Sequence, residues 1–162
     1  AERLLRKLRG TCVHKNEGWW TYEFCFMQSI RQYHVQVLET HTADDHSESK
    51  KTRIQSEFKL GHFNQKTKIK DEESIKNNPG QTGVPGYLEV EYQGGSSCQL
   101  TEKPRSTTVQ FRCGVEDKIV SIVEDQTCHY VAIVSTPVLC SHPLLGVKEE
   151  PSMTMYCSEQ SQ

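Results

Sequence analysis

Short segments of alternating polarity run through the chain and predict β-strands. In residues 20–26 (WTYEFCF) one face carries only aromatic side chains, and we expect this face to lie in the core. Trp19 falls on the opposite face, so its indole is expected to face solvent unless a bulge or strand end intervenes. Two adjacent tryptophans, Trp19 and Trp20, cannot both enter one core from a regular strand. At least one of them needs another role.

Further segments rich in Val, Ile and Thr show the same alternation, as strands prefer. They are residues 29–39, 53–63, 87–93, 106–114, 117–125 and 128–140. In the first of them Tyr33, Val35 and Val37 share one face, the expected core face, and Gln32 and His34 lie on the opposite one. Seven or so short strands separated by turns predict an all-β domain, either a barrel or a sandwich.

Polar segments mark the ends and the loops of this domain. Leu4, Leu5 and Leu8 have helical spacing before Gly10, so residues 1–10 are either a short helix packed on the barrel or a linker. The folded domain is expected at 11–145, with charged loops at about 40–52 and 64–86 and a turn of helix in the second loop. Residues 146–162 are expected to form a polar tail.

Composition narrows the classes of partner. The chain of 162 residues fits one domain, and its 19 Lys and Arg against 21 Asp and Glu give a net charge of −2. Such a charge offers no field that would gather nucleic acid or an anionic membrane. No apolar run approaches the roughly 20 residues of a membrane span, and the first ten residues do not resemble a signal peptide. We therefore expect a soluble chain, or a segment of a longer precursor.

The seven cysteines are widely spaced and form no CxxC motif, which argues against zinc ribbons and thioredoxin-type redox sites. Their positions beside strand-like segments favour a disulfide framework in an oxidising compartment, with free buried thiols as the alternative. Because the number is odd, one thiol is unpaired or has a partner outside this segment, and Cys157 in the polar tail is the best candidate.

Motifs of catalysis are absent from the sequence. The seven histidines show no metal-binding spacing, and there is no GxSxG, P-loop or GxGxxG motif. We therefore expect no enzyme, no metal and no cofactor. A small disulfide-bonded β domain with exposed aromatic residues suits either sugar binding or protein docking, since saccharides pair polar side chains with their hydroxyls and aromatic rings with their C–H faces.

Four stretches resemble a known family, and this resemblance favours sugar binding over protein docking. EGWWTYEFC, IRQYH, GGSSCQLTEKPRSTTVQFRC and VEDQTCHYVAIVSTPVLC resemble the mannose 6-phosphate receptor homology domain of endoplasmic-reticulum lectins of the osteosarcoma-amplified and erlectin type. The similarity runs from about residue 12 to residue 140 and loosens between about 40 and 86. It implies a flattened antiparallel β-barrel of two sheets. It also implies three disulfides, namely Cys12–Cys25, Cys98–Cys128 and Cys113–Cys140.

The resemblance also implies a carbohydrate site. The family's four sugar-contacting residues fall on Gln32, Arg105, Glu124 and Tyr130, and its tryptophan pair falls on Trp19 and Trp20. Gln and Arg would bind the axial 2-hydroxyl of mannose and its neighbour, Glu would accept from the 3- and 4-hydroxyls, and Tyr would close the site. The tryptophans would contact the mannose linked next to the terminal one.

By this resemblance the chain is a lectin of the endoplasmic-reticulum lumen. It would bind trimmed high-mannose N-glycans with an exposed terminal α1,6-linked mannose on misfolded glycoproteins and deliver them to degradation. The family's partners are a membrane-embedded ubiquitin-ligase complex with its luminal adaptor, and luminal chaperones. The alternatives are a noncatalytic glycan-binding subunit of a glucosidase or phosphotransferase, and a disulfide-bonded protein-docking domain.

Overall fold

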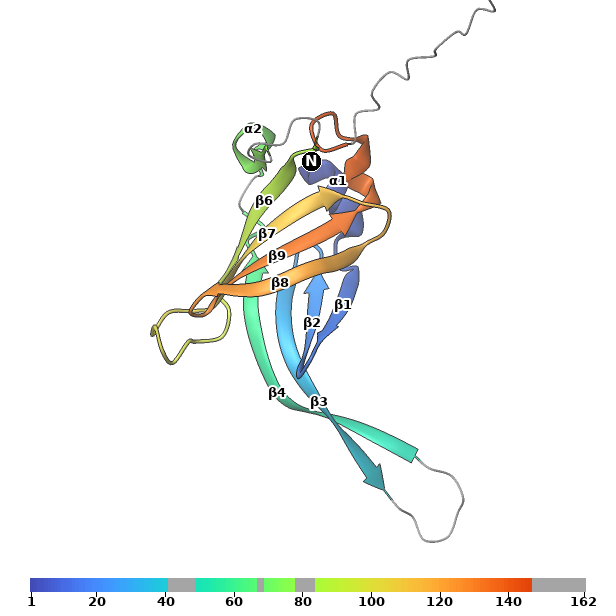
Figure 1. The fold of residues 1–162 in the computed structure, drawn as a ribbon. Helices are drawn as coiled ribbons and strands as arrows, with labels where there is room; N and C mark the ends of the chain where they lie inside the picture. The colour runs from blue at the N-terminus through green and yellow to red at the C-terminus, as the bar shows by residue number, and fades with distance from the viewer. Residues whose placement is uncertain (41–48, 67–68, 78–83, 147–162) are drawn as a thin grey trace, which may run out of the picture.

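A computed structural model describes residues 1–40, 49–66, 69–77 and 84–146, and these residues form a flattened β-barrel (Figure 1). The strands are β1 (Cys12–Glu17), β2 (Trp20–Cys25), β3 (Ser29–Thr40), β4 (Ser49–Phe63), β5 (Ile75–Lys76), β6 (Tyr87–Gln93), β7 (Ser106–Cys113), β8 (Lys118–Gln126) and β9 (His129–Thr136). The helical elements are α1 (Glu2–Leu5), α2 (Asp71–Ser74) and two 3₁₀ turns, Arg6–Leu8 and Pro137–Ser141. The predicted all-β barrel is confirmed.

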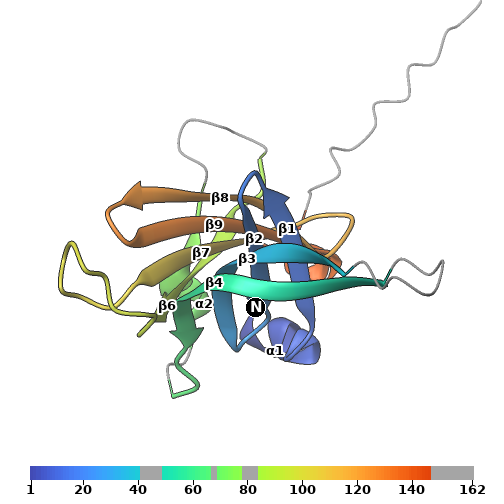
Figure 2. The ribbon, with the colours of Figure 1, turned by 90° about the horizontal axis from the view of Figure 1, so that it is seen from below.

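Two walls make up the barrel. The hydrogen-bonded order is β1-β2-β3-β4-β6-β7-β9-β8, with β5 paired to β6. Strands β1–β4 form one wall and β6–β9 the other, and β1 and β2 run across the direction of β7–β9 when seen from below (Figure 2). The walls are continuous because β4 pairs with β6 over two residue pairs. Pairing is antiparallel except between β7 and β9, which run parallel because β9 enters the sheet between β7 and β8.

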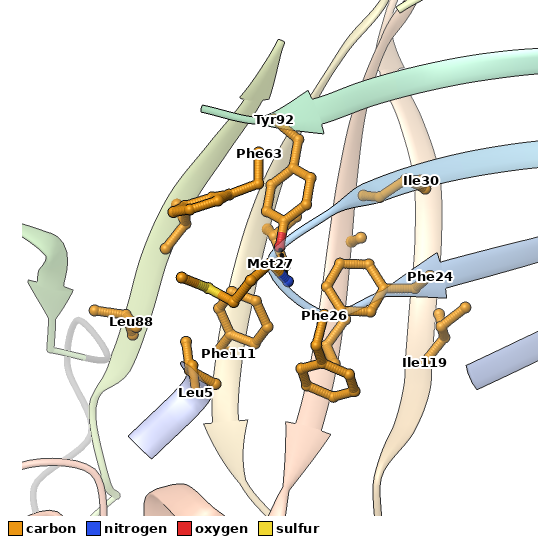
Figure 3. Packing of buried hydrophobic residues seen from close by; sticks show 14 of the residues in the cluster. Leu5, Phe24, Phe26, Met27, Ile30, Phe63, Leu88, Tyr92, Phe111 and Ile119 are labelled. Atoms are coloured by element: carbon orange, nitrogen blue, oxygen red, sulfur yellow. Dashed lines mark hydrogen bonds between the residues drawn. The ribbon is translucent and has the colours of Figure 1, made fainter. Parts of the chain in front are cut away.

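Aromatic side chains from both walls fill the core (Figure 3). The ring centroid of Phe24 lies 5.1 Å from that of Phe26, 5.6 Å from that of Tyr92 and 5.7 Å from that of Phe111. These distances and tilts suit aromatic pairs. The buried Tyr92 hydroxyl accepts a hydrogen bond from the backbone nitrogen of Met27 at 3.2 Å, which satisfies its polar atom.

The N-terminal segment is a short helix packed on the barrel, not a linker. Leu5 of α1 is fully buried in the same core cluster as the aromatic residues. Figure 1 shows α1, α2 and the C-terminal 3₁₀ turn at one end of the barrel, whereas the β1–β2 and β8–β9 turns lie toward the other. Helix α2 lies in the segment where the sequence predicts a helical turn.

The side chains of β3 that point into the core are not the ones that the sequence predicts. Ile30 and Gln32 are buried, whereas Tyr33 lies on the outer side beneath the Arg31 guanidinium and Val37 is 53% exposed. At both register shifts the extra residue lies on β4, Leu60 at the first and Gln55 at the second, so β3 keeps its period of two. Its inward face is the one that carries Ile30 and Gln32, opposite to the prediction. Beyond these shifts β3 and β4 leave the barrel as a projecting hairpin (Figure 1), so no wall covers their apolar side chains. The charged loop expected at 40–52 is also shorter, because β4 begins at residue 49.

Three disulfides link the described elements. They are Cys12–Cys25, Cys98–Cys128 and Cys113–Cys140, the same three pairs that the family resemblance implies. The first links β1 to the end of β2. The second links the loop before β7 to the β8–β9 turn, and the third links the end of β7 to the C-terminal 3₁₀ turn. Cys157 lies outside the described residues.

Candidate functional site

The inner face of the first wall contributes one polar side chain flanked by two aromatic ones. Gln32 of β3 lies directly opposite Tyr22 of β2 and Phe58 of β4 in the strand register, so the three side chains share a face. Gln32 is only 6% exposed. A buried amide with aromatic neighbours can offer both a donor and an acceptor to a ligand. The sequence places Tyr22 on the aromatic face expected in the core, and the structure adds Tyr22 and Phe58 to the site.

Arg105 reaches this face from the loop just before β7. Its guanidinium carbon lies 4.5 Å from the centroid of the Phe58 ring, a cation–π geometry. Its Nη1 donates to the carbonyl oxygens of Ser97 at 2.6 Å and Ser96 at 3.4 Å. Its Nε is buried and has no hydrogen-bond partner among the described residues. The guanidinium is therefore fixed in place while one of its donors has no acceptor from the described protein.

The second wall contributes a carboxylate and a phenol at adjacent positions. Glu124 of β8 and Tyr130 of β9 are directly opposite each other in the register. The Oε1 atom of Glu124 accepts a hydrogen bond from the backbone nitrogen of Cys128 at 2.7 Å, which holds the carboxylate against the β8–β9 turn. Cys128 in turn is joined by its disulfide to Cys98 in the loop that precedes Arg105. The backbone hydrogen bond, the strand pairing and the disulfide thus connect Arg105, Glu124 and Tyr130.

Electrostatics links the two walls at this point. Burial raises the pKa of Tyr130, the charge of Glu124 raises it further, and a hydrogen bond from Arg105 lowers it, with a net increase. Burial also raises the pKa of Tyr22, and Tyr130, Glu17 and Glu124 add to the increase. Both phenols therefore keep their protons at neutral pH and remain hydrogen-bond donors. Tyr130 of β9 and Glu124 of β8 therefore lie close enough to Tyr22 of β2 to interact with it electrostatically.

The tryptophan pair divides between two environments. Trp20 is half-buried, and its ring meets the edge of Phe58 at a centroid distance of 5.9 Å and an angle of 69°. Trp19 is 59% exposed, as the alternation predicts. The Trp19 indole stacks on the imidazole of His34 with centroids 3.4 Å apart and planes 11° apart. His34 is one of the seven histidines that show no metal-binding spacing, and no signal in the single sequence distinguishes it from the others.

A chain of contacts therefore joins the sequence-predicted residues. Phe58 touches Arg105 and Trp20 and lies opposite Gln32, Arg105 interacts electrostatically with Tyr130, and Tyr130 faces Glu124. Trp19 joins the group through His34, which lies two positions after Gln32 on β3. The site combines donors, acceptors and aromatic surfaces, and one arginine and one glutamate supply its charges. This combination suits a neutral polyhydroxylated ligand.

The described residues offer neither a metal site nor a membrane-spanning helix. Within residues 1–40, 49–66, 69–77 and 84–146, no group of three or more His, Cys, Asp or Glu side chains could hold a metal ion. Across the same ranges no helix has the length and hydrophobicity needed to cross a membrane.

Known proteins share both the sequence pattern and the fold. A family described as glucosidase II beta subunit-like protein matches residues 10–98. The Protein OS-9 homolog of Arabidopsis thaliana is 31% identical over 97% of this chain and 51% of its own length. Endoplasmic reticulum lectin 1 of Mus musculus is 31% identical over 92% of this chain and 32% of its own length. The chain therefore spans about half or less of the length of these curated relatives.

A solved structure resembles the barrel. The solution structure of the MRH domain of Yos9 complexed with alpha3,alpha6-Man5 superposes with a TM-score of 0.62 and 25% sequence identity. The similarity covers 92% of this chain and 88% of the solved chain.

Proposed function

Since the chain belongs to the glucosidase II beta subunit-like family, we propose that it is a lectin that binds the terminal mannose of trimmed high-mannose N-glycans. The observation that carries the proposal is the convergence of Gln32, Arg105, Glu124 and Tyr130 from both walls onto one site. Phe58 underlies this site and the tryptophan pair borders it. The MRH domain of Yos9, which shares the fold, has been solved with a bound mannose pentasaccharide.

The chemistry of the four side chains matches mannose. The unpartnered Nε of Arg105, together with the Gln32 amide, donates to the axial 2-hydroxyl and its neighbour. Glu124 uses carboxylate capacity not taken by the Cys128 nitrogen to accept from the 3- and 4-hydroxyls. Tyr130, protonated at neutral pH, donates its hydroxyl proton. A single shallow site of this kind gives a dissociation constant on the order of 10 μM to 1 mM, so capture depends on avidity or a partner.

The names of the relatives support a biological setting for this domain. Two of them are named OS-9 homolog and endoplasmic reticulum lectin, and we place this domain in the endoplasmic-reticulum lumen. There it binds glycans with an exposed terminal α1,6-linked mannose on misfolded glycoproteins and directs them to degradation. Its protein partners are a ubiquitin-ligase complex with a luminal adaptor, and luminal chaperones. The domain recognises the glycan without turnover.

A second function is favoured by the family description itself. A noncatalytic subunit of a glucosidase would use the same mannose site but deliver the glycan to a catalytic chain. Co-purification of the full-length protein from its own cells separates the two. Recovery of a glycosidase subunit supports the second function, and recovery of the ubiquitin-ligase adaptor supports the first.

A glycan array tests the lectin proposal and its specificity. Wild-type protein should bind glycans with exposed α1,6-linked mannose, and Glu124→Gln should lose this signal while its circular dichroism stays unchanged. Glu73→Gln is the matched control, because Glu73 is an exposed carboxylate on α2 at the other end of the barrel. Binding that is equal in all three proteins would exclude Glu124 from the site, and no mannose signal in any would favour a docking domain.

A further inference from the structure

The strongest observation that the proposed function leaves unused is the contact between His34 and Trp19. Trp19 lies in the β1–β2 turn, where Gly18 has a positive φ of 56° and the chain has no strand partner of its own. An exposed indole on such a turn would ordinarily sample several rotamers. Two separate interactions with His34 limit this freedom.

The first interaction fixes the backbone of the turn. The Nδ1 atom of His34 lies 2.8 Å from the carbonyl oxygen of Trp19. A carbonyl oxygen only accepts hydrogen bonds, so Nδ1 carries the proton and donates it. The bond connects the β1–β2 turn to β3 across fifteen residues of sequence.

The second interaction fixes the ring. The imidazole lies parallel to the indole at a centroid distance of 3.4 Å, so it covers one face of Trp19. Because the side chain remains 59% exposed, its open surface is available to solvent. A sugar can therefore pack its C–H face on one side of the indole only.

His34 lies close to the proposed terminal-mannose site along β3. Side chains two apart on a strand share a face, and Gln32 lies two residues before His34 on β3. The stacked pair therefore lies one strand repeat, about 7 Å, from the buried amide of the terminal-mannose site. This spacing is close to the length of one hexose unit.

We infer that His34 is a positioning residue that presents Trp19 as a one-sided platform for the mannose linked next to the terminal one. The inference rests on the proposed lectin function and deepens it, because it assigns the linkage preference to a histidine that does not touch the terminal sugar. Without His34 the terminal-mannose site persists, but the platform is no longer held in place.

The test compares two probes, methyl α-mannoside and α1,6-linked mannobiose, by titration calorimetry. His34→Ala should lower affinity for the disaccharide about fivefold, as expected for loss of an aromatic platform, and leave affinity for the monosaccharide unchanged. Trp19→Ala should show the same pattern. The double variant Trp19→Ala with His34→Ala should be no weaker than Trp19→Ala alone, because His34 acts only through Trp19.

Two conservative variants separate the interactions, and one variant serves as a control. His34→Phe keeps the stacked ring without the donor, and His34→Asn keeps a donor without the ring. If the stack fixes the platform, Phe restores disaccharide affinity and Asn does not. The control is His62→Ala. His62 is an exposed histidine near the end of β4, where β4 pairs with β6. Unchanged disaccharide affinity in His34→Ala, or a further loss in the double variant, would overturn the inference.

A measurement without sugar keeps this inference separate from the lectin proposal. Heteronuclear NMR relaxation of the Trp19 indole N–H should show greater ring motion in His34→Ala than in wild type. If wild type binds neither mannoside, the lectin proposal fails and the indole relaxation alone decides whether His34 positions Trp19. Equal relaxation in both proteins would rule out positioning.

Discussion

Arg105 is the residue whose surroundings most restrict what the site can bind. Its guanidinium rests on Phe58, one terminal nitrogen is held by loop carbonyls, and its Nε lacks an acceptor among the described residues. A buried unsatisfied donor costs free energy that a ligand hydroxyl can recover. Glu124 opposite a protonated Tyr130 adds acceptors and a donor at the same place. The site is thus prepared for a ring that carries several hydroxyls.

The two tryptophans should have separable effects on binding. Trp19→Ala removes an exposed platform and should weaken α1,6-linked oligosaccharides by about fivefold while sparing mannose. Trp20→Ala should weaken both ligands, because Trp20 packs on the ring beneath Arg105. Titration of each variant with mannose and with a linked oligosaccharide checks this. Equal losses for both ligands in Trp19→Ala would indicate a structural role for that indole.

At the residue scale, the sequence could predict residues that lie in recognisable motifs, but not a residue whose role depends on the fold. Gln32, Arg105, Glu124 and Tyr130 lie in motifs that resemble known lectins, so the resemblance proposes them as site residues, and the structure places them near one another. Phe58 could not be found this way, because its role depends on cross-strand register and on a loop more than forty residues away.

Among the elements, β4 contains a glycine that the barrel requires. Gly61 has a φ of 154°, and a Cβ there would lie 2.4 Å from the backbone oxygen of Tyr92. Gly61→Ala should therefore lower the free energy of unfolding by roughly 2–4 kcal/mol, since the clash is with backbone. Urea unfolding measures this loss. Gly18→Ala is the control, because no atom lies within 4 Å of its Cβ, and only conformational strain is expected there. Similar losses in both variants would contradict the clash.

Ion pairs across β1–β4 should make the free energy of unfolding depend on pH. Glu23 accepts from Arg31 at 2.6 Å and from the His14 ring at 2.8 Å, and Arg31 also bonds Glu57. Hydrogen bonds from Arg31, then from His14, lower the pKa of Glu23 although burial opposes them. The folded chain thus binds this proton less readily than the unfolded chain. The stabilisation is complete above the unfolded pKa and is lost as pH falls toward the folded one.

Glu23→Gln should therefore be about 1 kcal/mol less stable than wild type at neutral pH. The difference should shrink as pH falls through and below the usual titration range of glutamate, because wild type loses the same interaction there. Denaturant unfolding across this pH range provides the measurement. A difference that stays constant with pH would show that the Glu23 charge is not involved.

The alternation of polarity predicted where most strands lie but not how β3 faces. The rule assumes a regular strand with a wall on one side, which holds for β6, where Leu88, Val90 and Tyr92 are all buried. It fails for β3, because the polar Gln32 shares the buried face with Ile30, and the strand then leaves the barrel so that Val37 is exposed (Figure 1). A single sequence does not show which polar side chain of a strand faces inward, nor where a hairpin leaves the barrel.

For the whole molecule, the disulfides have different roles although two of them close loops of similar length. Replacing both Cys98 and Cys128 with Ser should cost about 2–4 kcal/mol of stability and should also abolish mannoside binding, because the bridge joins the Arg105 loop to the turn that holds Glu124. Replacing Cys113 and Cys140 removes a bridge of nearly equal separation, 27 residues against 30, at the other end of β7. That control should lose similar stability and keep its affinity. Titration of each variant with a mannoside, below its unfolding temperature, measures this difference in affinity.

The overall architecture was accessible from sequence through two independent features. Period-two patterns predicted an all-β chain, and resemblance supplied the flattened barrel and the cysteine pairing that the structure also shows. The parallel pairing of β7 with β9 was not accessible, because the pattern of a strand does not state the direction of its neighbour. It matters for the site, since this pairing sets the start of β7 beside the start of β9 and so brings Arg105 to Tyr130.

The central claim is that both walls of the barrel together bind mannose. Titration calorimetry with α1,6-linked mannobiose tests it most directly, using wild type, Arg105→Ala and Arg53→Ala, where Arg53 is an exposed arginine on the projecting hairpin. We predict micromolar to millimolar binding for wild type and Arg53→Ala, unaffected by EDTA. Arg105→Ala should retain its circular dichroism and show no measurable heat of binding. Unaltered binding by a folded Arg105→Ala protein would contradict the account.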